Sequence, residues 1–242
     1  MDTIADLHDD GHAFLAAAEK AGLDAPVPHC PGWDVRRLVR HVGKVFERTA
    51  IVVEENLDGP PDRDRFSRFP EDGGAYDRFR EVLTEMVDVL RAADPEAPAW
   101  NFTGASEVTA FWPRRMANEI AVHRWDAEEA SGAAPGPVRT ERAVDGIDEL
   151  LTVLLPFSAA QTATEVHGSV HLHCTDTEGE WLTVLDGGTV TTTREHAKGD
   201  LAVKGPASTL FLWAWNRAPL GSEGLESFGD PSLADAWSTI GL

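Results

Sequence analysis

The sequence predicts an α+β protein of two domains, an N-terminal four-helix bundle and a small C-terminal α+β domain with an antiparallel sheet. Through about the first 155 residues, apolar side chains recur every three or four positions, which is the period of a helix with one buried face. From residue 166 onward they alternate with polar side chains, which is the period of half-buried strands. This change of period predicts domains over residues 1–157 and 158–242.

Four amphipathic segments make up the predicted bundle. Thr3 is the expected N-cap of the first helix, which ends at Gly22, and Asp34 is the expected N-cap of the second. The third helix is predicted over residues 76–93 and the fourth over residues 109–130. The loops between them are short to moderate, which favours an antiparallel bundle.

The remainder of the chain is predicted to combine helices with strands. A fifth apolar helix is expected from residue 140 to about residue 155. Strands are expected over residues 166–174, 181–186, 189–195 and 200–205, with helices over residues 207–217 and 231–237.

The charge balance and the apolar pattern exclude several classes of protein. The chain has 41 acidic and 21 basic residues, a net charge of -20, which repels phosphate backbones and excludes a general nucleic-acid binder. The N-terminus is acidic and no run of about 18 apolar residues occurs, so we expect neither a signal peptide nor a membrane span. Cys30 and Cys174 are too far apart to indicate a disulfide framework or a multi-thiolate zinc site. We expect a cytoplasmic protein that is a monomer or a weak homodimer.

Glu119 and His123 lie four residues apart on the predicted fourth helix, which places both side chains on one face, as two ligands of one metal ion require. Apolar residues share that face, so it points toward the core. A metalloprotease helix would need histidines at the positions of Asn118 and Val122, and that reading fails. On its own, a Glu/His pair at this spacing is more often a surface pair.

His41 is the candidate for a third ligand, because it lies on the inward stripe of the predicted second helix. An inward histidine is more often a hydrogen-bonded core residue. Opposite an inward Glu/His pair, however, it completes a site of two histidines and one carboxylate, which leaves coordination positions open for water or substrate. Asp126 can accept the imidazole N–H of His123, although a solvent-facing role is an equal alternative.

Four segments carry a resemblance to a known family. They read PHCPGWDVRRLVRHV, RRMANEIAVHRWDAE, VHLHCTDTEGEWLTV and GDLAVKGPASTLFLWAWNR. The sequence resembles the mycothiol-dependent maleylpyruvate isomerase family over most of its length. The resemblance implies a DinB-like metal-binding bundle followed by a sterol-carrier-type α+β domain. It also implies that the family's metal triad falls on His41, Glu119 and His123.

Arginines are the candidates for binding a carboxylate substrate, because a chain this acidic needs local positive charge to attract one. The resemblance implies that an arginine late in the C-terminal domain closes over the site, and Arg217 matches it. Arg68 is the second residue assigned a catalytic role, in a cluster with Arg63 and Arg65. The further candidates are Arg114, Arg115 and Arg124. Alternatives stay open, since Arg217 can cap a helix C-terminus and the cluster can be a solvated loop.

Two other features have weaker functional readings. His167, His171 and His173 share the polar face of one predicted strand, but no carboxylate or cysteine joins them on that face, which favours solvent exposure or cross-strand packing. Cys30 precedes Pro-Gly-Trp and is read as a small buried side chain beside Trp33, with a redox thiol as the alternative.

The chemistry expected of the triad is thiol activation. A divalent ion, zinc by preference, lowers the pKa of a bound thiol below its free value of about 8.5. With mycothiol as cosubstrate, such a site can isomerise a double bond or transfer the thiol to a small electrophile. The expected partners are therefore a small-molecule substrate and a low-molecular-weight thiol. A hydrolase-type enzyme that activates water is one alternative, and a non-catalytic ligand-binding or stress-related protein is another.

Overall fold

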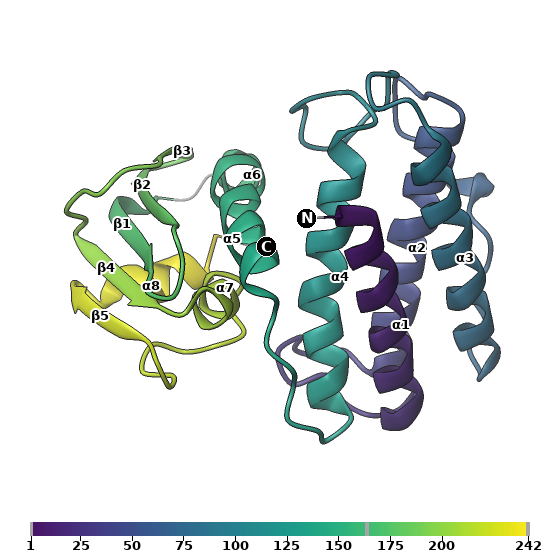
Figure 1. The fold of residues 1–242 in the computed structure, drawn as a ribbon, viewed down its shortest axis with the longest axis horizontal. Coiled ribbons are helices and arrows are strands. Elements are labelled where there is room, and N and C mark those ends of the chain that lie inside the picture. The colour runs from purple at the N-terminus through teal and green to yellow at the C-terminus, as the bar shows by residue number, and fades with distance from the viewer. Residues whose placement is uncertain (1, 163–164, 241–242) are drawn as a thin grey trace. The chain divides into compact units, whose positions relative to one another are not determined.

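The computed structural model describes residues 2–162 and 165–240 and divides into two compact units, Met1–Gly136 and Pro137–Leu242 (Figure 1). The division falls 21 residues earlier than the sequence-based boundary at 157/158. The two positions differ because the helix that begins at Thr140 packs against helix α7 (Ala207–Ala214) of the second unit. An apolar helical pattern shows that a helix is buried, but not against which partner.

The first unit is the expected four-helix bundle (Figure 1). Its helices are α1 (Thr3–Ala21), α2 (Val35–Glu54), α3 (Gly74–Ala92) and α4 (Phe111–Ala130), with a short 3-10 turn, η1 (Arg63–Arg65), between α2 and α3. Helix α1 packs mainly on α4, and α2 packs mainly on α3. Aromatic rings join these pairs at the centre, where Phe79 lies 4.9 Å from Phe14 and 5.8 Å from Phe46 between ring centroids.

The first turns of two helices test the predicted caps. The predicted cap at Asp34 is confirmed, because its carboxylate accepts a 2.8 Å hydrogen bond from the backbone N–H of Arg37. The cap of α1 is Asp2, whose carboxylate accepts the N–H of Ala5 at 3.0 Å, so the assignment to Thr3 was wrong by one residue. An aspartate carries a negative charge that the helix N-terminus favours, which a threonine lacks.

The second unit holds a five-stranded sheet with helices. In chain order its elements are α5 (Thr140–Glu149), the π turn η2 (Leu150–Leu154), α6 (Leu155–Thr162), β1 (His167–Cys174), β2 (Glu180–Asp186), β3 (Thr189–Thr193), β4 (Leu201–Gly205), α7, β5 (Glu226–Gly229) and α8 (Ser232–Ser238). The helical run that starts at Thr140 is therefore longer than predicted. Its first part, α5, packs on α7, whereas α6 packs on β3.

The sheet is mixed, which corrects the expectation of an antiparallel one. Its strand order is β3-β2-β1-β4-β5, and β4 runs parallel to β1 while the other three pairings are antiparallel. After β3 the chain therefore has to return across the sheet before β4 begins. Strand periodicity is the same for a hairpin and for such a crossover, so the sequence pattern could not distinguish them. Strand β5, at the edge, was not predicted at all.

Within the part of the chain that the structure describes, no helix combines the length and the apolar character needed to cross a membrane.

Gly43 on α2 fixes the loop that precedes α3. A Cβ atom at this position would lie 2.1 Å from Cζ of Phe69, a buried ring in that loop. Such a distance is far inside van der Waals contact, so only glycine lets Phe69 seat against the helix. Two residues before Gly43, the same helix carries His41.

We expect Gly43→Ala to lower the free energy of unfolding. Overpacking of this kind costs about 1–3 kcal/mol, which exceeds the gain of about 1 kcal/mol from alanine's higher helix propensity. Urea denaturation measures the change. Gly59→Ala is the matched control, because no atom lies within 4 Å of its Cβ position. Equal stability of the Gly43→Ala variant and the native chain would contradict the proposed close contact.

Candidate functional site

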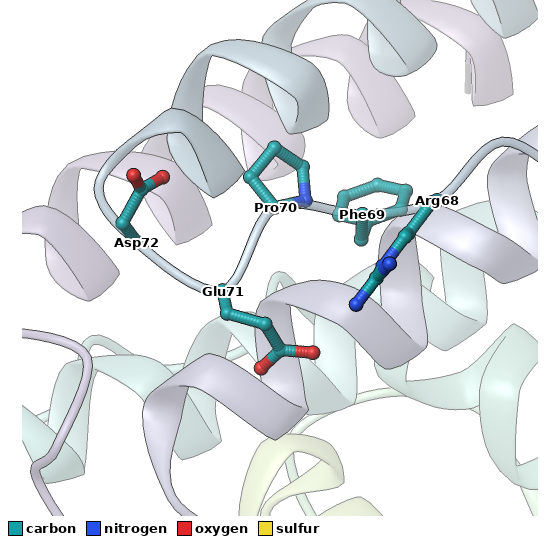
Figure 2. Close-up of a pocket in the computed structure, with 5 residues that line it drawn as sticks. All are labelled: Arg68, Phe69, Pro70, Glu71 and Asp72. Carbon is teal, nitrogen blue, oxygen red and sulfur yellow. The ribbon is translucent and has the colours of Figure 1, made fainter.

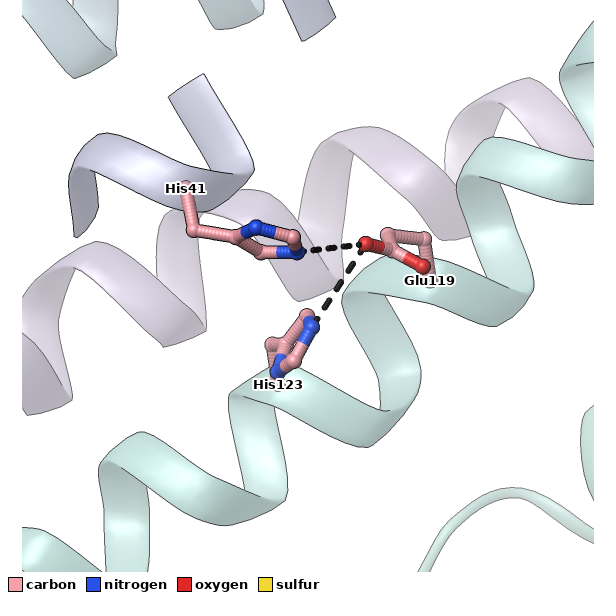
Figure 3. Close-up of side chains that lie close together, drawn as sticks. All are labelled: His41, Glu119 and His123. Atoms are coloured by element: carbon pink, nitrogen blue, oxygen red, sulfur yellow. Dashed lines mark hydrogen bonds and ion pairs between the residues drawn. The ribbon is translucent and has the colours of Figure 1, made fainter. Parts of the chain in front are cut away.

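His41, Glu119 and His123 lie together on the facing sides of α2 and α4 (Figure 3). The Nε2 atom of His41 is 3.2 Å from Oε1 of Glu119, and Nε2 of His123 is 3.5 Å from the same oxygen. One ligand atom from each residue lies within 4.8 Å of the other two. The helical spacing that suggested this grouping therefore does bring the three side chains together, and both imidazoles direct the same nitrogen at one carboxylate oxygen.

The group is buried on one side and open on the other. The side chains of Glu119 and His123 are 13% and 10% exposed, whereas that of His41 is 38% exposed. The ring of Trp33 lies edge-on to His41 at 5.0 Å, and the guanidinium of Arg37 lies 4.6 Å from the Trp33 ring centre. The Pro-Gly-Trp turn thus holds the exposed imidazole in place with an aromatic contact.

Arg115, one helical turn before Glu119, forms a buried ion pair with Oε2 of that carboxylate. Burial raises the pKa of Glu119, but the charge of Arg115 and the hydrogen bonds from His123 and His41 outweigh burial, so the pKa lies well below its usual range. Glu119 is therefore an anion. Because Arg115 occupies Oε2, Oε1 is left to face the two histidines.

Asp126 fixes the orientation of His123. Its buried carboxylate accepts a 2.9 Å hydrogen bond from Nδ1 of His123, which confirms the pairing expected from their spacing. The thiol of Cys30 lies 3.7 Å from the same carboxylate oxygen, so Cys30 contacts the site through Asp126. With Nδ1 bound to a carboxylate, Nε2 of His123 is the nitrogen turned toward Glu119.

These residues fit a divalent transition-metal ion. Two imidazole nitrogens and one carboxylate oxygen are a common donor set for zinc, and three protein ligands leave at least one coordination position for a small molecule. The bond from Asp126 to His123 is the support that metal-binding histidines usually have.

Arg48 is a residue of this site that the sequence reasoning missed. It follows His41 by seven residues on α2, a spacing that repeats the same helical face. Burial lowers the pKa of Arg48, the negative charge of Glu119 raises it, and the positive charge of Arg115 lowers it further. The guanidinium therefore lies within range of both charges. Its buried Nε makes no hydrogen bond among the described residues, and Phe102 lies 5.7 Å from the guanidinium carbon. The seven-residue spacing from His41 to Arg48 was the sequence signal that could have identified this residue.

Arg68 lies in an open pocket of about 410 Å³ formed by the loop before α3 (Figure 2). The pocket is lined by Arg68, Phe69, Pro70, Glu71 and Asp72, and by none of the triad residues. Glu71 is held by an ion pair to Arg40 at 3.2 Å. The structure thus places Arg68 on a short loop anchored to α2, exposed to solvent.

Arg217 lies in the second unit, directly after α7. Its Nη1 donates a 2.7 Å hydrogen bond to the backbone carbonyl of Trp215, and its own N–H donates to the carbonyl of Leu212. Asn216 between them has a positive φ of 61°, typical of a residue that ends a helix. The helix-capping interpretation of Arg217 therefore has direct support.

The other arginines of the sequence analysis are distributed over the first unit. Arg65 pairs with Glu55, and Arg124 pairs with Asp10 and Glu128. Arg63 is exposed and Arg114 is half-buried. Arg115, by contrast, forms an ion pair with Glu119 of the triad.

The strand histidines correct one expectation. Glu180 on β2 and His196 after β3 do join His171 and His173, although no carboxylate was expected on that face. The third histidine of that strand, His167, is separate and pairs with Asp186 at 3.0 Å.

The titration of His123 gives a test of its surroundings. In the metal-free chain, burial lowers the pKa of His123, but Asp126 and Glu119 outweigh burial and raise it from 6.5 to about 9. A raised pKa stabilises the fold fully below pH 6.5, and this contribution is lost as the pH rises through about 9. We expect Asp126→Asn to lower the pKa of His123 and to reduce stability most below pH 6.5. NMR of the imidazole protons and urea unfolding at several pH values measure both effects.

Asp186→Asn, which removes the carboxylate beside the exposed His167, is the control and should leave the His123 titration unchanged. A His123 pKa that does not move in Asp126→Asn would contradict the role assigned to Asp126.

Comparisons with known proteins match sequence in both units of the chain. A family model for the mycothiol maleylpyruvate isomerase N-terminal domain matches residues 4–128, and the model for the C-terminal domain of the same family matches residues 141–236. No curated protein sequence matches the chain.

Two solved structures are similar over nearly the whole chain. A crystal structure of the mycothiol-dependent maleylpyruvate isomerase has a TM-score of 0.60 and 11% identity, covering 93% of this chain and 91% of that one. A histidine-to-alanine mutant of that isomerase has a TM-score of 0.59 and 10% identity, with 93% and 91% covered. At such low identity these structures establish only the two-part fold. The two family models together span most of the sequence, and they establish the family. The chain belongs to the mycothiol maleylpyruvate isomerase family.

Proposed function

We propose that this protein is a metal-dependent enzyme that uses mycothiol to isomerise a small unsaturated acid of the maleylpyruvate type or to transfer the thiol to a small electrophile. The observation that carries the proposal is the convergence of His41, Glu119 and His123 on one point at the partly open face between α2 and α4. Membership of the family supports mycothiol as the cosubstrate.

The three residues would hold one divalent ion, zinc by preference, as two neutral imidazoles and one carboxylate. Such an ion lowers the pKa of a small thiol and so supplies a nucleophile at neutral pH. The protein's own residues prepare the ligands. Arg115 keeps Glu119 ionised and Asp126 holds the ring of His123, while the open side at His41 leaves room for thiol and substrate.

The two reactions differ only in the fate of the thiol. In an isomerisation the sulfur adds to one carbon of a cis double bond, the resulting single bond rotates, and the sulfur leaves as the trans bond forms. The thiol is returned unchanged. In an S-transfer the sulfur stays bonded to the substrate carbon, and a leaving group departs or a proton is taken up. Both reactions need the same metal ligands, so product analysis distinguishes isomerisation from S-transfer.

Positive charge near the triad supports an acidic substrate. Arg48 has a buried Nε with no hydrogen bond in the described part of the chain, close enough to Glu119 for their charges to interact. In a chain of net charge -20, a carboxylate needs such a local attraction. We include Arg48 as a substrate-binding residue, together with Arg68 and Arg217 from the sequence analysis.

The test begins with metal analysis of protein purified without an affinity tag, followed by incubation with maleylpyruvate and mycothiol. A trans product with thiol unconsumed supports the isomerase, and a thioether with thiol consumed one for one supports the S-transferase. Turnover that needs metal but no thiol would replace the proposal with a water-activating hydrolase. Stoichiometric metal without any turnover or thiol binding would favour a non-catalytic protein.

We expect His123→Ala to lose the zinc ion held by the triad and all thiol-dependent turnover while keeping most of its helical circular dichroism. The variant lacks one of the three proposed protein ligands, and the two that remain bind the ion more weakly. His12→Ala, on the exposed surface of α1, is the matched control and should keep metal and activity. If purified His123→Ala retains one tightly bound zinc ion with native affinity at this position, the triad is wrong.

We expect Arg48→Met to raise KM for the acidic substrate about 10- to 100-fold without changing the zinc content, because a hydrogen bond to a charged group contributes about 1.5–3 kcal/mol. Lys44→Met, exposed on the same helix, is the control and should behave as the native enzyme. The same kinetics on Arg68→Met and Arg217→Met test the other two arginines. An unchanged KM in any of the three variants removes that arginine from the proposal.

A further inference from the structure

The second unit contains a separate cluster of three histidines around one glutamate. His171 and His173 are two residues apart on β1, and Glu180 on β2 pairs directly with His173. Strand residues two apart, and residues paired across strands, share a face of the sheet. His196 reaches the same carboxylate from the crossover between β3 and β4. The cluster thus joins three segments of the chain.

Nitrogen atoms of all three imidazoles lie close to one oxygen atom. Oε1 of Glu180 is 3.1 Å from Nε2 of His171, 2.7 Å from Nδ1 of His173 and 2.5 Å from Nδ1 of His196. The rings of His171 and His196 meet at right angles, with centroids 5.7 Å apart. Three imidazole nitrogens and one carboxylate oxygen therefore lie close together on this face.

His171 is the buried member, although it lies on the more open face of the sheet. It is 8% exposed, because the crossover passes over it. A Cβ atom at Gly199 in that crossover would lie 2.8 Å from the backbone nitrogen of His171. The Nε2 atom of His171 is buried and makes no hydrogen bond among the described residues, since its approach to Glu180 lacks hydrogen-bond geometry.

A buried nitrogen without a hydrogen bond is costly, and native structures rarely leave one unexplained. A cation at this position would use that nitrogen as a ligand. One ligand atom from each of His171, Glu180 and His196 lies within 4.8 Å of the other two. In tetrahedral zinc, bonds of about 2.0–2.1 Å place ligand atoms roughly 3.3 Å apart, so small side-chain rotations would bring these atoms into range.

We propose that His171, Glu180 and His196 form a second site for a divalent transition-metal ion, independent of the triad on α2 and α4. The donor set of two imidazoles and one carboxylate selects zinc over calcium or magnesium, which prefer oxygen ligands. His173 holds the Glu180 carboxylate by its hydrogen bond and is a positioning residue. The ion ties the crossover to β1 and β2, which gives the site a structural role.

The proposal is tested by zinc titration of the full chain, monitored by competition with a chromophoric chelator. The native protein and the His12→Ala variant should bind two equivalents. His123→Ala should lose only the zinc ion at the triad. His196→Ala and Glu180→Gln should each weaken zinc affinity at the second site at least tenfold. Both of these variants spare the buried His171, and the His196 side chain is 83% exposed, so the fold is expected to persist. Cobalt substitution gives a second readout, since each site contributes its own visible absorption.

His167→Ala is the matched control, because His167 lies on the same strand and face but pairs with Asp186. It should leave both equivalents in place. Native second-site affinity in both His196→Ala and Glu180→Gln would overturn the proposal, and so would an equal loss in His167→Ala, which would indicate unspecific binding to surface histidines. Failure of the triad proposal is recognised separately, because His123→Ala would then keep both zinc equivalents.

Discussion

The ionised carboxylate of Glu119 is the interaction on which the candidate site depends. A carboxylate removed from water destabilises the fold by several kcal/mol unless opposite charge and hydrogen-bond donors surround it. Arg115 supplies the charge from the same helix, and His41 supplies a donor from α2. The two helices are therefore linked by electrostatics as well as by apolar packing. The side chains that would bind an ion also hold the bundle together when no ion is bound.

Much of this site could be predicted from the sequence, because it is built from helices. The 3.6-residue period fixes which side chains share a face, and that period grouped Glu119 with His123 and Asp126, and turned His41 inward. Arg48 obeys the same rule but was overlooked, since a single arginine on a long helix reads as a solvent-exposed residue. The period could not assign the role of Arg115, because only the structure shows its guanidinium buried against Glu119.

The second unit was harder to predict, because its organisation depends on contacts between distant segments. Alternation located strands β1 to β4 but carried no information on strand order, and the exposed edge strand β5 lacks a buried alternating face. The cluster around Glu180 was missed for the same reason. Its members are 25 residues apart from His171 to His196, and only the register of β1 with β2 and the path of the crossover bring them together.

The π turn at Leu150–Leu154 lets one continuous helical run serve two packing partners. A π turn amounts to one extra residue in an α-helix, and one residue corresponds to a rotation of about 100°. Helix α5 packs on α7, whereas α6, whose buried residues are Leu155 and Ala159, packs on β3. In an alignment of relatives, a one-residue gap at these positions would thus record a rotated packing face and not a shortened loop.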